Sequence, residues 1–218
     1  HPGDVHRVTA MRHPASMLRR QPAPRLYGKR VMLRPLTDSD FTAWREVRIR
    51  NEGWLLPWEP RRQPTMPDPT RDRAAFSARC NARDRERAAD HAYPFGVFVD
   101  QQLAGEVNLN NVTRGALQSA TVGYWIDQQR AGQAYIAEAV AVLMRFAFEQ
   151  LHLHRLEVCI VPRNANSLRV MEKLELRCEG VAERFLEIAG VWEDHARFAI
   201  TVEEWETRSE ELTARWLQ

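Results

Sequence analysis

Two short stretches of the chain carry residue types that could do chemistry. The first is residues 129–134, QRAGQA, which lie between a strand-like run and a long apolar-periodic run. Small residues at the start of a helix leave backbone N–H groups open to an anion, and Arg130 adds a positive charge. The segment has neither the Lys-Ser/Thr pair of a P-loop nor the three glycines of a dinucleotide fingerprint. Two readings therefore remain open, a phosphate cradle and a plain turn.

The second stretch is GEVNLN, residues 105–110, in which polar and apolar residues alternate. On a strand, Glu106, Asn108 and Asn110 share one face, while Val107 and Leu109 point to the other. A carboxylate beside two amides suits a wet cleft, and Glu106 is the leading candidate for a general base there. The alternative is a solvated sheet face on which Glu106 has no chemical role.

The elements that must position these residues alternate between two hydrophobic periods. Antiparallel hairpins mixed with strand–helix–strand crossovers predict a single α+β domain around a mixed sheet. Hairpin turns are expected at residues 100–102 and 189–190, and the prolines of residues 54–70 predict a shaped loop without regular structure. Strands are predicted at residues 29–36, 93–100, 102–112, 119–127, 155–161, 180–188 and 191–201, and helices at residues 41–51, 71–90, 134–151, 164–174 and 203–217.

Composition narrows the class of protein. The chain has 218 residues, of which 44% are hydrophobic, and a formal net charge of only +2, so bulk charge gives no reason to expect direct nucleic-acid binding. Three scattered cysteines favour a reducing, cytoplasmic location over a disulfide framework, and no apolar run is long enough for a membrane span. Residues 1–25 are predicted to be a basic, proline-containing leader or a remnant of expression, and residues 26–218 the single domain. His152 and His154 lack the partners for a metal site, so no metal is expected.

The QRAGQA segment resembles the motif Gln/Arg-x-x-Gly-x-Gly/Ala of the GNAT superfamily of N-acetyltransferases, which grips the pyrophosphate of acetyl coenzyme A (acetyl-CoA). Residues 164–174, NANSLRVMEKL, resemble the family's Asn-x-x-Ser…Glu-Lys-Leu motif, whose helix flanks the pantetheine arm. The two motifs occur in the family's order, and together they are far more specific than either alone. The resemblance implies the GNAT acyl-CoA N-acyltransferase fold, with a central mixed, mostly antiparallel sheet flanked by helices. It implies acetyl-CoA as cofactor, bound by Trp125, Ile126, Arg130, Ala131, Gly132, Gln133, Ala134, Tyr135, Asn164, Ser167, Met171 and Lys173.

Four further segments, LPWEP, NNVTRGAL, LHLHRLEV and EGVAERFLEIAGVWEDH, resemble the RimJ branch of this family. That likeness implies acetylation of a protein N-terminal α-amine, with a ribosomal protein such as small-subunit protein S5, which starts with alanine, as the partner. The protein is then a monomer or a homodimer. Two alternatives stay open: a small-molecule acetyltransferase acting on an amino acid, polyamine or aminoglycoside, and a non-catalytic acyl-CoA-binding module. Acceptor-binding residues implied by the likeness are Trp58, Glu59, Asn108 and Tyr124.

The resemblance also assigns catalytic roles. Ser167 is the expected proton donor to the departing thiolate, although a serine there could equally cap its helix. Glu106, water or another carboxylate is left to take the amine proton, and a backbone N–H near Trp125–Ile126 is expected to meet the developing oxyanion. The chain departs from the family where Gly-Phe normally ends the second motif and Glu175-Leu176 stands instead, which predicts an altered turn beside the cofactor. The acidic final helix is either a solvated face or a docking face for a basic ribosomal protein.

Overall fold

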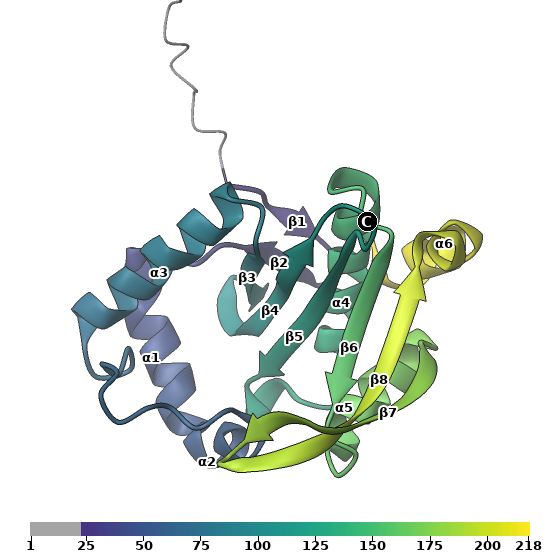
Figure 1. The fold of residues 1–218 in the computed structure, drawn as a ribbon. Helices are drawn as coiled ribbons and strands as arrows, with labels where there is room; N and C mark the ends of the chain where they lie inside the picture. Colours follow the sequence, from purple (N-terminus) through teal and green to yellow (C-terminus); the bar gives the residue numbers. More distant parts are fainter. Residues whose placement is uncertain (1–22) are drawn as a thin grey trace, which may run out of the picture.

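The computed structural model describes residues 23–218, and the predicted leader falls almost entirely outside them. These residues form one eight-stranded sheet in the order β1-β2-β3-β4-β5-β6-β8-β7 (Figure 1). All neighbouring strands are antiparallel except the pair β5–β6, so the expected mixed, mostly antiparallel sheet is confirmed. The strands are β1 (Leu26–Tyr27), β2 (Val31–Arg34), β3 (Tyr93–Val99), β4 (Gln102–Thr113), β5 (Ser119–Ile126), β6 (Arg155–Ile160), β7 (Arg177–Ile188) and β8 (Val191–Thr201).

Helices cover both faces of this sheet. In the first group, α1 (Phe41–Arg50) contacts β4 and α3 (Arg73–Ala88) contacts β3, while the short α2 (Glu52–Leu55) follows α1 at its far end (Figure 1). The second group comprises α4 (Tyr135–Arg145), α5 (Ala165–Leu174) and α6 (Val202–Trp216), of which α4 packs across β2, β4 and β5. Short 3-10 turns lie at Asp38–Asp40, Leu56–Trp58 and Gln128–Arg130, and a π-helical turn, Phe146–Gln150, extends α4.

The core lies between the sheet and α4. Residues 136–144 of α4 are all buried, because this helix is apolar on nearly every side and is enclosed by the sheet, α5 and α6. Val107 and Leu109 are fully buried on the α4 side of β4, as the strand alternation predicted. A smaller apolar cluster around Trp44 and Phe76 fills the space beneath α1 and α3. Both layers therefore hold β4 and β5 firmly in place.

The parallel strands β5 and β6 separate partway along their length. They pair only from Ser119 to Thr121 on β5 and from Arg155 to Glu157 on β6. Beyond these residues the two strands diverge toward the N-termini of α4 and α5 (Figure 1). The unpaired edge of β5, residues 122–126, therefore faces a gap in the sheet instead of a neighbouring strand.

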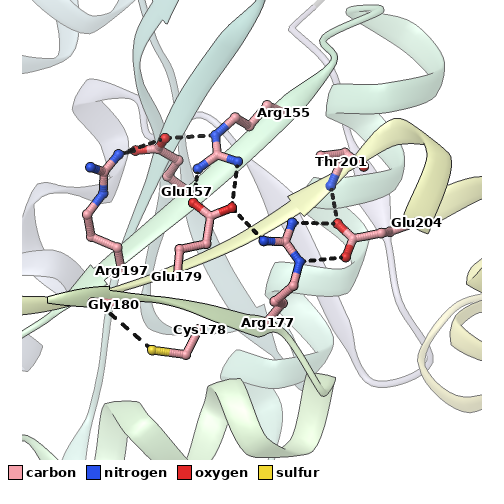
Figure 2. Close-up of polar contacts among 9 residues, drawn as sticks. All are labelled: Arg155, Glu157, Arg177, Cys178, Glu179, Gly180, Arg197, Thr201 and Glu204. Atoms are coloured by element: carbon pink, nitrogen blue, oxygen red, sulfur yellow. Dashed lines mark hydrogen bonds and ion pairs between the residues drawn. The ribbon is translucent and has the colours of Figure 1, made fainter.

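One part of the sheet face carries charge instead of a covering helix. Leu156, Val158 and Ile160 of β6 point into the core, so Arg155 and Glu157 point to the opposite face. There Arg155 bridges Glu157 and Glu179, and ion pairs continue to Arg177, Arg197 and Glu204 (Figure 2). Hydrogen bonds from Arg155 and Arg177 lower the pKa of Glu179 to about 2. This network joins β6, β7, β8 and α6 into one unit.

The local sequence pattern predicted most of the helices and strands but missed the short helical turns of the proline-rich segment. Both hairpin turns form where expected, with left-handed backbone at Asp100, Gln101, Ala189 and Gly190. The proline-rich segment is not wholly irregular, because α2 and the turn Leu56–Trp58 occupy its start, where Pro57 stands at a position that needs no N–H donor. Within residues 23–218, no helix is both long and apolar enough to cross a membrane.

Candidate active site

A cavity of about 280 Å³ opens at the gap between β5 and β6. Its walls come from α2, β4, β5, the loop before α4, the N-terminal half of α4 and one face of α5. Most residues expected to bind a cofactor or acceptor line this cavity: Trp58, Glu59, Asn108, Tyr124, Trp125, Ile126, Arg130, Ala131, Gly132, Ala134, Tyr135, Asn164, Ser167 and Lys173.

The loop before α4 has the geometry of an anion cradle. Gly132 has φ +77°, and a Cβ there would meet nothing within 4 Å, so the backbone lies open on that side. Ala134, the residue before the helix, also has a left-handed backbone, with φ +64°. The first-turn N–H groups of an α-helix have no intrahelical acceptor, and here they begin at the cavity wall. Arg130 is held beside them by a 2.9 Å hydrogen bond to Gln102.

The start of α5 forms a second wall of the cavity. Asn164 caps this helix, since its Oδ1 accepts the Ser167 N–H at 3.2 Å. The capping role considered for Ser167 therefore belongs to Asn164. The Tyr124 hydroxyl reaches the same place and donates to the Ser167 carbonyl at 3.3 Å. Burial raises the pKa of Tyr124, and the contact with Ser167 only partly offsets that effect, so Tyr124 stays protonated. Ser167 and Tyr124 thus bring two hydroxyl groups to one wall.

The edge of β5 presents backbone N–H groups to the gap. The Asp127 N–H donates to Ala104 on β4 at 2.7 Å, which marks these two residues as a hydrogen-bonded antiparallel pair. Hydrogen-bonded and non-hydrogen-bonded residue pairs alternate along an antiparallel ladder. The backbone N–H of Trp125 therefore points to β4, while the N–H groups of Tyr124 and Ile126 point away from it. Of the two residues expected to meet an oxyanion, Ile126 is the one whose N–H faces the gap.

A larger cavity of about 990 Å³ lies on the other side of β5, between α1, the loop of residues 59–72 and the β7–β8 turn. The two cavities share Leu55, Glu59, Asn108 and Trp125. Glu59 accepts two hydrogen bonds from Arg48, at 2.7 and 2.8 Å, and its side chain keeps 29% exposure. The buried Asn108 Oδ1 has no hydrogen-bond donor among the described residues. A partly exposed carboxylate, paired with Arg48, and an unused acceptor therefore lie where the cavities meet.

Glu106 does not lie on a solvated face; it lines the larger cavity, as a cleft residue would, but there it is enclosed by other side chains. It is 1% exposed and accepts hydrogen bonds from Arg79, Arg83, Trp44 and Trp125 at 2.6 to 3.2 Å. Burial alone would raise the pKa of Glu106, but the two guanidinium groups outweigh burial and lower it. A carboxylate that is enclosed and paired in this way is a poor proton acceptor. Its surroundings assign it instead to joining α3 to β4.

Two residues expected at the cofactor lie elsewhere. Met171 is 1% exposed and packs in the core, because it lies on the face of α5 that also carries Leu174. The Gln133 side chain is exposed outside the cavity wall, and its carbonyl accepts a hydrogen bond from Arg30. The cavity is lined instead by residues that the sequence analysis missed, including Asn166, Arg169 and Val170. The three-residue spacing of Ser167, Val170 and Lys173 on one helix face could have revealed Val170.

The turn after α5 keeps the usual geometry despite its unusual residues. Glu175 adopts a left-handed backbone, with φ +52°, and the Leu176 N–H bonds back to the Met171 carbonyl. This is the conformation that a glycine supplies without strain at a helix C-terminus. Glu175 therefore holds a backbone conformation that costs a residue with a side chain some strain, and whether this turn differs from that of the family stays a prediction.

The remaining candidates have structural roles. His154 pairs with Glu203 at 2.9 Å, and the described residues contain no group of three potential metal ligands. On α6, Glu203 pairs with His154 and Glu204 with Arg177, so two carboxylates of its acidic face already have partners.

Comparisons with known proteins agree with this geometry. The sequence model of the acetyltransferase (GNAT) domain matches residues 30–177. The chain is 44% identical over 113 residues to the probable N-acetyltransferase YjcK of Bacillus subtilis, a match that spans 51% of this chain and 62% of YjcK. It is 30% identical over 188 residues to the ribosomal protein uS5-alanine N-acetyltransferase of Escherichia coli, covering 84% of this chain and 94% of that enzyme. Among solved structures, Mycobacterium smegmatis RimJ in complex with CoA-disulfide superposes with a TM-score of 0.78 at 32% identity, covering 88% of this chain and 93% of that one.

Proposed function

The chain belongs to the GNAT acetyltransferase family, and on that premise we propose that it acetylates the N-terminal α-amine of a protein. The proposed acceptor is a ribosomal protein that begins with alanine, such as small-subunit protein S5, as the relatives' substrates suggest. A ribosomal acceptor also makes the cytoplasm the proposed site of action. The proposal rests on the junction at Glu59 and Asn108, where the two cavities meet. The cavity of about 280 Å³ is taken as the cofactor cavity, and the cavity of about 990 Å³ as the acceptor groove.

The residues present fit acetyl-CoA, which GNAT enzymes use. The open backbone at Gly132 and the first turn of α4 would hold the pyrophosphate, with Arg130 adding a positive charge. The unpaired edge of β5 would hold the extended pantetheine arm through backbone groups, as a neighbouring strand would. When bound, acetyl-CoA supplies an activated acetyl thioester. The Ile126 N–H is oriented to stabilise negative charge on the acetyl oxygen, and Ser167 or Tyr124 to protonate the thiolate.

Glu59 is the carboxylate proposed to meet the acceptor amine. Among residues 23–218 it is the only acidic residue lining the cofactor cavity, and it also lines the acceptor groove. An α-amino group titrates near 8, so it arrives mostly as an ammonium ion and must lose a proton before attack. The Glu59 carboxylate and Asn108 Oδ1 can accept hydrogen bonds from that ammonium, and Glu59 can take or relay its proton. The enclosed Glu106 is not needed for this step.

The acceptor groove favours a protein over the small-molecule alternatives. Its described lining contains seven arginines and four acidic residues, which disfavours polyamines and aminoglycosides because both are polycations. A volume of about 990 Å³ also exceeds the need of a single amino acid. An extended N-terminal tail fits both properties.

The experiment that tests this proposal locates the acetyl group on an acceptor peptide. The protein is incubated with acetyl-CoA and a peptide that begins with alanine and contains an internal lysine, and the product is fragmented by mass spectrometry. The acetyl group is expected on the alanine α-amine. Acetylation of the lysine side chain alone, or of neither amine, would contradict the proposal.

A further inference from the structure

The acceptor groove carries more positive charge than the acidic residues around it can neutralise. Its arginines are Arg45, Arg48, Arg61, Arg62, Arg71, Arg79 and Arg83, against the four acidic residues Glu52, Glu59, Asp68 and Glu106. The formal excess is therefore three positive charges. A cleft lined by one sign of charge concentrates ligands of the opposite sign.

Most of these arginines already have a carboxylate partner. Arg48 pairs with Glu59, Arg62 with Asp68, and Arg79 and Arg83 both with Glu106. Arg71 also pairs with Asp68, but at a longer distance of 3.7 Å, and its side chain is 82% exposed. Glu106 and Asp68 thus each face two arginines, and two further arginines of the groove have no carboxylate partner among the described residues.

Arg45 and Arg61 are those residues. Arg45 donates through Nε to the Thr70 carbonyl at 2.9 Å, and Arg61 donates through Nη2 to the Ala189 carbonyl at 3.4 Å. Within residues 23–218, neither has a carboxylate within 4.0 Å, and both are exposed. Each backbone carbonyl uses one N–H of a guanidinium that has five, so the others remain open to a ligand.

The fold holds these two guanidinium groups in place. The β7–β8 turn reaches the loop after α2 (Figure 1), where the Ala189 N–H donates to the Glu59 carbonyl at 2.8 Å. The Arg61 guanidinium lies beside Gly190, whose lack of a side chain leaves room for it there. Arg45 is tied to the loop of residues 59–72 through Thr70. Preorganised donors lose less conformational entropy when they bind an anion.

We propose that Arg45 and Arg61 form a subsite for a carboxylate of the acceptor chain, so that the enzyme selects N-terminal tails with an Asp or Glu a few residues behind the reactive amine. This inference rests on the proposed function. The groove is continuous with the junction at Glu59 and Asn108, so a chain whose first residue reaches that junction must place its next residues along the groove. Arg–carboxylate pairs are strong, and Arg presents a fork that matches a carboxylate.

The test is a binding scan that does not depend on turnover. Peptides of about ten residues begin with alanine and carry one Glu, placed in turn at positions two to eight of a neutral sequence, with a fluorophore at the C-terminus. Each is compared with its Gln counterpart by fluorescence anisotropy at low salt in the presence of CoA. The protein variants are the double substitution R45Q/R61Q and the control R85Q, which removes an exposed arginine of α3 that does not line the groove.

Wild-type protein is expected to bind the Glu peptide on the order of 10-fold more tightly than its Gln counterpart at one or two positions. In R45Q/R61Q the two peptides should bind within about 2-fold of each other, while R85Q keeps the preference. Salt at about 0.5 M should reduce the preference in the wild type, because exposed charges are screened.

Equal binding of Glu and Gln peptides at every position, or no binding of either, would overturn the subsite. Persistence of the preference in R45Q/R61Q would overturn the assignment to these arginines. Tighter binding of a single-stranded RNA oligonucleotide, lost in the double variant, would overturn the peptide reading in favour of RNA. Failure of the proposed function is distinguishable, because the mass-spectrometric assay would then find no acetyl group on the alanine α-amine even where acidic peptides bind.

Discussion

Arg83 donates a 2.6 Å hydrogen bond to Glu106, so a fully enclosed carboxylate on β4 is joined to α3. Arg79, one turn earlier on the same helix, contacts both oxygens of that carboxylate. A buried ion pair is costly to break from one side, because the remaining charges keep their desolvation cost without their partner. The relationship therefore makes Glu106 a stability residue.

Replacing Glu106 with Gln should destabilise the protein by about 3 kcal/mol or more at neutral pH, because two arginines lose their counter-charge. Folding lowers the pKa of Glu106, so its contribution is fully present above the ordinary value of 4.5 and is lost as the pH falls below it. The stability difference between wild type and E106Q should therefore shrink in acid. Urea unfolding at pH 7 and at pH 3, well inside the range where the contribution is lost, measures both effects. Equal stability at pH 7, with a lower kcat/KM, would restore Glu106 as a candidate base.

Replacing Glu59 with Gln should lower kcat/KM for an N-terminal peptide by at least about 100-fold, because a group that accepts the amine proton is lost. The affinity for CoA should stay the same, and E59D should recover part of the activity. Glu52 lines only the acceptor groove, which makes E52Q the matched control, expected to retain near-wild-type kcat/KM. Steady-state kinetics beside calorimetry with CoA make this comparison. If E59Q and E52Q behave alike, Glu59 has no role at the reacting amine.

Replacing Gly132 with Val should weaken CoA binding by at least about 10-fold. The new side chain would occupy the open side of the cradle, and a β-branched residue fits poorly at φ +77°. G115V is the control, because Gly115 also has a left-handed backbone, at φ +69°, with nothing within 4 Å of a Cβ, and lies in the β4–β5 turn. It shares the backbone strain but not the cavity. Calorimetry should find CoA affinity reduced in G132V alone; unchanged affinity there would remove the cradle from this loop.

Replacing Glu175 with Gly should stabilise the protein by about 1 kcal/mol, because glycine adopts the left-handed backbone of this helix end without strain. Little is lost with the side chain, since its Arg208 contact is 3.8 Å long and exposed. E172G in the last turn of α5 is the opposite control and should lose about 1 kcal/mol. Chemical denaturation of the three proteins gives the comparison. A loss of stability in E175G would show that the side chain matters more than the backbone.

The sequence predicted features that depend on neighbouring residues better than features that depend on residues far apart along the chain. The loop before α4, the helix of residues 164–174 and both hairpins have local signals, such as small residues, caps and turn pairs, and they form where expected. The surroundings of Glu106 come from arginines more than 20 positions away, on a helix whose charged pattern is typical of a solvated face. Strand alternation placed Glu106 on the correct face but could not reveal that α3 covers it. Likewise, nothing local indicated that Ala189 would contact Glu59 and complete the groove.

The central claim is that the acceptor is a protein N-terminus, and a competition experiment tests it most directly. Peptides beginning with Ala, Ser, Thr and Met, each with an acidic residue behind the amine, are mixed with free amino acids, a polyamine and an aminoglycoside, and kcat/KM is determined for each acceptor with acetyl-CoA. Ala- and Ser-starting peptides are expected to exceed every small amine in kcat/KM by at least about 100-fold. A polyamine, an aminoglycoside or a free amino acid with a higher kcat/KM than all of the peptides would contradict it.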